Sequence, residues 1–285
     1  MAEASRLSRL RQDGGAFHLG PRTRVLVTGN DAKRYLSGQL SNDPTKIPPN
    51  GSIRALLLTA KGKLCAPVVV METEGGYLLD ADAALHDGLI ARVGRYIVAD
   101  DVAVEDISPD DAGWHVFGAV SREAKGVDVA RLGEFGRDCP ELPSGVLETT
   151  PDEIELLRIE RGIPKWGCEL NEDTLPHEAG LDRSHVDFHK GCYVGQETVS
   201  RVQSVGRTNR ILRGFLGAFT PRPGALLDAG GLRLGTITSA ARHFELASSA
   251  ALGYLNTRTT EVRFAVTSPS GESLGECQIH EFPLV

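Results

Sequence analysis

The chain has 285 residues, of which 41% are hydrophobic, and a formal net charge of -7 at pH 7. This length predicts about two domains of roughly 150 residues each. The acidic balance gives no electrostatic basis for wrapping nucleic acid, because a basic surface is the expected footprint of that function. We therefore expect no direct nucleic-acid partner.

The five cysteines are scattered and contain no C-x-x-C pair. This spacing argues against a disulfide framework and against a conventional zinc site, and it fits a reducing compartment. The first residues lack the apolar run of a secretory signal, and no segment approaches the ~20 consecutive apolar residues of a membrane span. We predict a cytoplasmic protein without a bound metal and without membrane contact.

Residues 16–107 read as an α+β module. Three strands in succession imply an antiparallel sheet, and the helices that flank them indicate a ferredoxin-like arrangement instead of a parallel doubly wound sheet. Turn signals and apolar periodicity set the limits of each element. The predicted strands are 16–29, 54–59, 64–71, 77–79 and 101–107, and the predicted helices are 32–40 and 82–96.

The chain then changes character twice. Strands are expected at 114–120 and 146–149, and a helix at 151–161 has an acidic start and ends before Gly162. Beyond residue 206, short strands separated by glycine and proline indicate a small β-barrel or sandwich. We predict an α+β module of two lobes over residues 1–208 and a β-domain over 209–285. The expected strands of this domain are 212–219, 232–239, 251–255, 261–267 and 275–282.

The run HKGCYVGQE at residues 189–197 stands out from this background. It places a cation, a thiol, a phenol, an amide and a carboxylate around two glycines, which allow sharp turns and close approach of a ligand. A thiol near a cation can be held partly as thiolate, so Cys192 and Lys190 are candidate catalytic residues. The alternatives are a buried structural thiol at Cys192, a surface lysine at Lys190 and a packed ring at Tyr193. Gln196 and Glu197 fit either a pocket or the start of a helix.

Three runs resemble the signature of YgfZ-type folate-binding proteins, which are relatives of the glycine-cleavage T protein, the tetrahydrofolate-dependent aminomethyltransferase. They are LRIERGIP at 157–164, TLPHEAGL at 174–181 and VDFHKGCYVGQE at 186–197. Weaker similarities extend over nearly the whole chain. The resemblance implies an aminomethyltransferase-like fold, with two α+β lobes and a C-terminal barrel around a central folate pocket.

The resemblance also implies which residues bind folate. Glu178 is the position whose carboxylate would bind the pterin, and a carboxylate suits this because it accepts two parallel hydrogen bonds. Arg201 is the candidate for the anionic tail of the folate. Tyr193, Gln196 and Glu197 complete the expected folate-binding set.

One departure separates this chain from the aminomethyltransferases. The turn and strand around Gly62 would carry a pair of aspartates there, one of them catalytic, where this chain has Cys65 and Ala66. Neither residue can act as a carboxylate toward an amine, so glycine-cleavage chemistry is disfavoured and whether the protein is an enzyme stays open.

The resemblance therefore indicates a tetrahydrofolate-binding accessory protein of iron–sulfur cluster assembly or repair. Effects on tRNA thiomodification would follow through iron–sulfur enzymes, and the expected partners are folate and iron–sulfur client proteins or assembly factors. A lone cysteine cannot hold a cluster by itself, which favours a transient role for Cys192. The alternatives are a folate-dependent one-carbon transferase that uses another base and a scaffold with a vestigial folate pocket.

Overall fold

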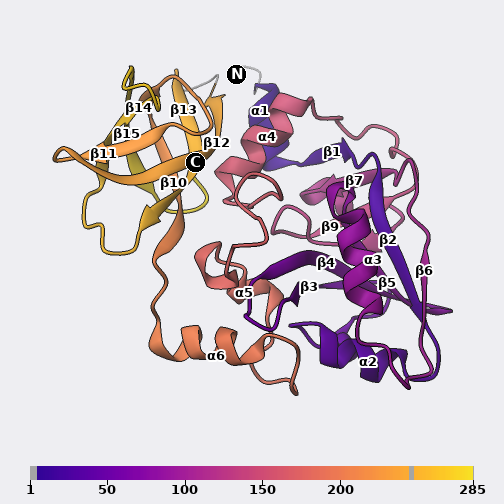
Figure 1. Cartoon of the computed structure of the whole chain (residues 1–285). Coiled ribbons are helices and arrows are strands. Elements are labelled where there is room, and N and C mark those ends of the chain that lie inside the picture. Colours follow the sequence, from indigo (N-terminus) through magenta and orange to yellow (C-terminus); the bar gives the residue numbers. More distant parts are fainter. Residues whose placement is uncertain (1–4, 244–246, 285) are drawn as a thin grey trace. The chain divides into compact units, whose positions relative to one another are not determined.

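A computed structural model of the chain describes residues 5–243 and 247–284, which form two compact units (Figure 1). The first comprises residues up to Thr149 together with Glu172–Pro176 and Leu181–Ser204. The second comprises Thr150–Asn171, His177–Gly180 and the chain from Val205 onward. No helix in the described residues is long and apolar enough to cross a membrane.

The larger sheet of the first unit has five antiparallel strands in the order β3-β4-β5-β2-β6. Strict alternation along β2 buries Thr23, Val25 and Val27 on one face, as expected of a half-buried strand. Helices α2 (Ala32–Gln39) and α3 (His86–Gly94) pack against this sheet (Figure 1). The strands are β2 (Arg22–Thr28), β3 (Ser52–Leu58), β4 (Leu64–Thr73), β5 (Gly76–Asp82) and β6 (Ala103–Asp106), and the 3-10 helices η1 (Pro44–Lys46) and η2 (Ala83–Leu85) lie in the connections.

The strand predicted over 16–29 is two strands. Gly20 adopts a φ of 62°, and Pro21 has no N–H to donate to a sheet, so the chain breaks between β1 (Gly15–His18) and β2. β1 joins a second, four-stranded sheet in the order β1-β7-β9-β8. Its other strands are β7 (Trp114–Phe117), β8 (Val127–Asp128) and β9 (Gly136–Cys139), accompanied by α1 (Arg6–Gln12) and η3 (Ala119–Arg122).

The strand predicted near 146–149 is wrong. Only an isolated bridge between Glu148 and Ala16 forms there, because the chain turns at once into helix α4 (Pro151–Glu160). Thr150 caps this helix and makes a capping box with Glu153, which satisfies two backbone N–H groups that the first turn leaves open. The helix itself was predicted from the sequence.

The second unit consists of α4 and a closed barrel in the order β10-β13-β12-β11-β14-β15. Phe215 and Phe264 meet edge to face at 5.9 Å in its core. The α+β fold with a C-terminal barrel is confirmed, and the barrel alternative holds over the sandwich. The strands are β10 (Arg210–Phe219), β11 (Leu226–Ala229), β12 (Leu232–His243), β13 (Ser248–Asn256), β14 (Arg263–Thr267) and β15 (Ser273–His280).

Three short elements follow α4 along the sequence and precede the first barrel strand. They are η4 (Pro176–Glu178), α5 (Asp182–His185) and α6 (Gln196–Val205). The change to the second unit falls between Ser204 and Val205, at the end of α6. The sequence indicated only a possible helix start at Gln196, because the polar composition of α6 hides its length.

Candidate functional site

The motif run forms a loop between α5 and α6 in the first unit. Its backbone is tied to the end of α2, since the N–H of Asp187 donates to the carbonyl of Ser41 at 3.0 Å and the N–H of Val194 to that of Gly38 at 3.1 Å. The thiol of Cys192, between these two anchors, is exposed. The loop therefore holds its backbone in place and presents its cysteine to solvent.

Lys190 is turned toward the same helix end. Its ammonium donates to the carbonyls of Ser37 and Leu40, both at 2.6 Å, and lies 5.1 Å from the centre of the Tyr193 ring. Burial lowers the pKa of Lys190 to about 8, although Asp43 and Asp187 oppose that shift. Tyr193 is buried, and this raises its pKa to about 12. The ammonium of Lys190 thus bonds backbone carbonyls at the end of α2.

The two glycines that face each other across this loop need their lack of a side chain. Gly195 has a φ of 90°, and a Cβ there would lie 2.6 Å from the carbonyl oxygen of Thr59. Gly62 has a φ of 74°, and its Cβ would lie 2.7 Å from Thr198. L-residues rarely adopt this backbone region. The β3–β4 turn and the start of α6 are therefore in direct backbone contact.

The remaining predicted residues of this unit lie on α6. The Oε1 atom of Gln196 accepts the N–H of Tyr193 at 3.3 Å, so Gln196 stabilises the turn into the helix. Glu197 is in the acidic first turn, where a negative charge is favourable. The side chains of Glu197 and Arg201 are exposed.

Glu178 lies in the second unit, where it is buried and paired with an arginine that the sequence analysis did not single out. The Nε atom of Arg210, on β10, donates to its Oε2 atom at 3.0 Å. The same guanidinium stacks over the ring of Tyr254 at 4.3 Å. The hydroxyl of Tyr254 in turn donates to the carbonyl of Glu169 at 3.0 Å, and burial raises the pKa of Tyr254.

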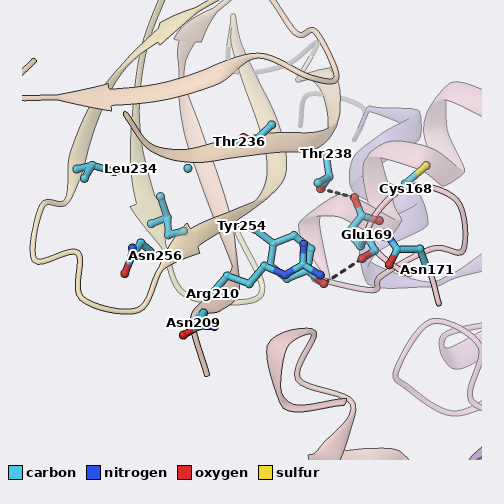
Figure 2. Close-up of a pocket in the computed structure, with 12 residues that line it drawn as sticks. Cys168, Glu169, Asn171, Asn209, Arg210, Leu234, Thr236, Thr238, Tyr254 and Asn256 are labelled. Carbon is cyan, nitrogen blue, oxygen red and sulfur yellow. Dashed lines mark hydrogen bonds between the residues drawn. The ribbon is translucent and has the colours of Figure 1, made fainter. Parts of the chain in front are cut away.

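Arg210 and Tyr254 form one wall of a polar cavity of about 510 Å³ in the second unit (Figure 2). Glu169 borders it but is committed elsewhere, because its carboxylate accepts from Thr238 and Ser239 at 2.6 Å each. Arg158 adds a charged hydrogen bond to Glu169 at 3.0 Å. Figure 2 shows the side chains that face the cavity, including Cys168, Asn171, Asn209, Leu234, Thr236 and Asn256.

Sequence reasoning missed Arg210 and Tyr254. Neither stands in a dense motif, and they lie 44 positions apart on strands β10 and β13. These strands are paired, with Arg210 opposite Asn256, two residues beyond Tyr254. Since side chains two positions apart point to the same face, a correct pairing of these strands was the signal that would have found them.

The position that separates this chain from the aminomethyltransferases lies on β4. Cys65 is half-buried, and burial raises the pKa of its thiol while the nearby Arg92 guanidinium opposes the shift. Arg92 is itself held by the carbonyl of Leu58 and the Oε1 atom of Gln39 at 2.8 to 3.1 Å. Within the described residues, no group of three or more His, Cys, Asp or Glu side chains is arranged to hold a metal ion.

The chain is similar in sequence and in fold to proteins that are already known. No family model matches the chain. The chain is 29% identical over 239 residues to the "Iron-sulfur cluster assembly factor IBA57 homolog, mitochondrial" of Mycosarcoma maydis, covering 72% of this chain and 58% of that protein, which is less than two thirds of its length. It is 29% identical to the mouse (Mus musculus) "Iron-sulfur cluster assembly factor IBA57, mitochondrial" over 88% of this chain and 83% of that protein.

Bacterial aminomethyltransferases also match the sequence. The crystal structure of the glycine cleavage system aminomethyltransferase T from Bartonella henselae superposes with a TM-score of 0.77 at 18% identity, covering 97% of this chain and 88% of that one. Together these relatives confirm the resemblance found in the motifs. The chain is similar to both groups of proteins and has the fold of the glycine-cleavage T proteins.

Proposed function

We propose that this protein is a tetrahydrofolate-binding accessory factor for the assembly or repair of iron–sulfur clusters. The observation that carries the proposal is the exposed thiol of Cys192 on a loop whose backbone is anchored on both sides of it, in a chain related to assembly factors of that pathway. Effects on tRNA thiomodification would follow through iron–sulfur enzymes, and the partners would be client proteins or other assembly factors.

The chemistry assigned to Cys192 is transient. As the thiolate, an exposed cysteine can attack the outer sulfur of a donor persulfide, which forms a persulfide on the cysteine and releases the donor thiolate. It can equally attack a folate-bound one-carbon unit, with the folate nitrogen as the leaving group. A stable cluster needs several ligands, and no metal-binding group of three or more acidic, His or Cys side chains is present in the described part of the chain. We therefore assign to Cys192 the handling of a sulfur or one-carbon fragment during assembly.

The folate part of the proposal rests on Glu178. A pterin presents two adjacent N–H donors on its amino-pyrimidine edge, and a carboxylate that is buried and held by a guanidinium is a fixed acceptor for them. A carboxylate can accept several hydrogen bonds at once, so pairing with Arg210 and binding a pterin are compatible. When bound, tetrahydrofolate would supply a carrier for one-carbon units. Tyr193, Gln196, Glu197 and Arg201 remain proposed folate contacts.

A second function, folate-dependent one-carbon transfer, is favoured by one observation, which is the match of 97% of the chain to an aminomethyltransferase fold. Against it stands Cys65, a half-buried thiol whose pKa is raised by burial, where a catalytic carboxylate is expected from the resemblance. A neutral thiol neither orients nor deprotonates an amine in the way a carboxylate does. Detection of aminomethyl transfer by the purified protein would reverse this ranking.

We also propose a reducing compartment, the cytoplasm, as the site of action. All five cysteines are free thiols, as expected where disulfides do not persist. The assembly factors to which the chain is similar are described as mitochondrial, so cell fractionation is the direct check. Recovery of the protein in an oxidising compartment would contradict the assignment.

The proposed function is tested by complementation in cells that lack the gene. The variants C192A and C192S should fail to restore the activity of iron–sulfur enzymes and the level of thiolated tRNA. The matched control is C168A, because Cys168 is also exposed but lies outside the motif. Full rescue by C192A, with normal expression, would remove Cys192 from the mechanism.

A further inference from the structure

The end of helix α2 lacks groups of its own to satisfy its carbonyls. The last four C=O groups of any α-helix have no intrahelical partner, and a cation near that end is favourable because of the helix dipole. The last turn of α2 contains no basic residue. Donors and a positive charge for this end therefore come from outside the helix.

The motif loop supplies both. Lys190 donates to the carbonyls of Ser37 and Leu40, and the N–H of Val194 donates to that of Gly38. Asp187 continues the contact through its N–H to the carbonyl of Ser41. Residues 187–194 therefore form the C-terminal cap of a helix that lies about 150 positions earlier in the chain.

Lys190 is the residue of this cap whose side chain contacts the helix end, through the two hydrogen bonds of its ammonium. The ammonium faces the carbonyls of Ser37 and Leu40 and the Tyr193 ring at 5.1 Å. Asp43 and Asp187 favour its charge, although burial lowers its pKa. Cys192 lies two residues further on, between Lys190 and the Val194 anchor, with its side chain exposed.

We infer that Lys190 is a positioning residue that clamps the loop of residues 187–194 to the end of α2 and so presents Cys192, instead of activating its thiol by charge. This inference rests on the proposed role of Cys192. In this arrangement the lysine two residues before Cys192 acts on the backbone of a helix that is distant in sequence, and not on the thiol.

The test compares K190M and K190Q with the wild-type protein and with K33M. Lys33 is an exposed lysine on α2 itself, so K33M removes a charge from the same helix without touching the cap. Hydrogen exchange of the peptide containing Val194 reports the clamp. Alkylation of Cys192 as a function of pH, followed by mass spectrometry of its peptide, reports the thiol.

For K190M we expect exchange at Val194 to rise at least about tenfold, because a local opening needs less free energy once the clamp is lost, while the midpoint of the alkylation profile stays in place. K190Q keeps a side-chain amide NH₂ group that can donate hydrogen bonds but carries no charge. Its exchange rate at Val194 should therefore lie between those of K190M and the wild type. K33M should match the wild type in both measurements.

The opposite pattern would overturn the inference. If Lys190 stabilises a thiolate, then K190M and K190Q both move the alkylation midpoint upward by about one pH unit or more while exchange at Val194 stays as in the wild type. K190Q decides alone if K190M does not fold. Both measurements use the purified protein without folate or clients, so a rescue by C192A would refute the proposed function and leave the clamp intact.

Discussion

The Cys192 loop and the Glu178 cluster are built in different ways. The loop is a contiguous run of residues held by backbone hydrogen bonds and glycine contacts, and its side chain of interest points to solvent. The cluster brings together Glu178, Arg210 and Tyr254 through side-chain pairing, and its carboxylate is buried. A contiguous run of residues thus forms a loop held by its backbone with an exposed cysteine, whereas the buried polar cluster is assembled from distant segments.

The largest expected effect tests whether the loop depends on backbone contact. G195A places a Cβ 2.6 Å from the Thr59 carbonyl oxygen at a φ of 90°, which should lower the free energy of unfolding by about 2–3 kcal/mol. Urea denaturation measures this. The control is G75A, since a Cβ at Gly75 meets nothing within 4 Å. Equal stability of the two variants would mean that the loop tolerates a side chain there.

The next effect tests the cluster through its ligand. E178A removes the proposed pterin acceptor and should weaken tetrahydrofolate binding at least about tenfold, as expected when a charge-assisted hydrogen bond is lost. Isothermal titration calorimetry measures the affinity, and the exposed Glu141 provides the control variant E141A. Absence of saturable binding in the wild-type protein would exclude the folate pocket altogether.

A smaller effect is expected from the partner of Glu178. R210M breaks the ion pair and the stacking on Tyr254, which leaves the carboxylate less well fixed and should weaken tetrahydrofolate binding about fivefold, or roughly 1 kcal/mol. R263M, at an exposed position of the same barrel, should bind like the wild type. Unchanged affinity in R210M would show that Glu178 does not need this guanidinium.

The smallest expected effect is on the free energy of unfolding and comes from Asp187, at the start of the Cys192 loop. Lys46 and the N–H of His189 lower the pKa of Asp187 below its usual value. A depressed carboxyl pKa contributes stability that is present above the unfolded pKa near 4 and is lost as the pH falls through the folded pKa. The difference in unfolding free energy between wild type and D187N should be under about 1 kcal/mol at neutral pH and vanish at low pH. A difference that persists in acid would contradict this origin.

Most of the secondary structure followed from local signals. The helix α4 and the strand that includes β2 were predicted from an acidic helix start followed by Gly162 and from a run of β-branched residues, which are properties of a few adjacent residues. The break at Gly20 and Pro21 and the length of α6 were missed, since apolar periodicity alone does not report a strand that changes sheet or a helix with only Val199 buried.

The candidate site divides in the same way. Cys192 and Glu178 were singled out as candidates from the sequence because their neighbours form recognisable runs. Arg210 was not, because its partners are 32 and 44 positions away and meet it only after the barrel strands and η4 are in place.

By itself, the sequence determined many of the short segments that become helices and strands, and that residues 189–197 are unlike an ordinary core segment. Only the tertiary structure decided what those residues face. Lys190 serves the carbonyls of α2 because a helix end needs donors that its own turn cannot supply. Arg210 stands against Glu178 because a buried carboxylate needs a compensating charge, and that charge can come from any part of the folded chain.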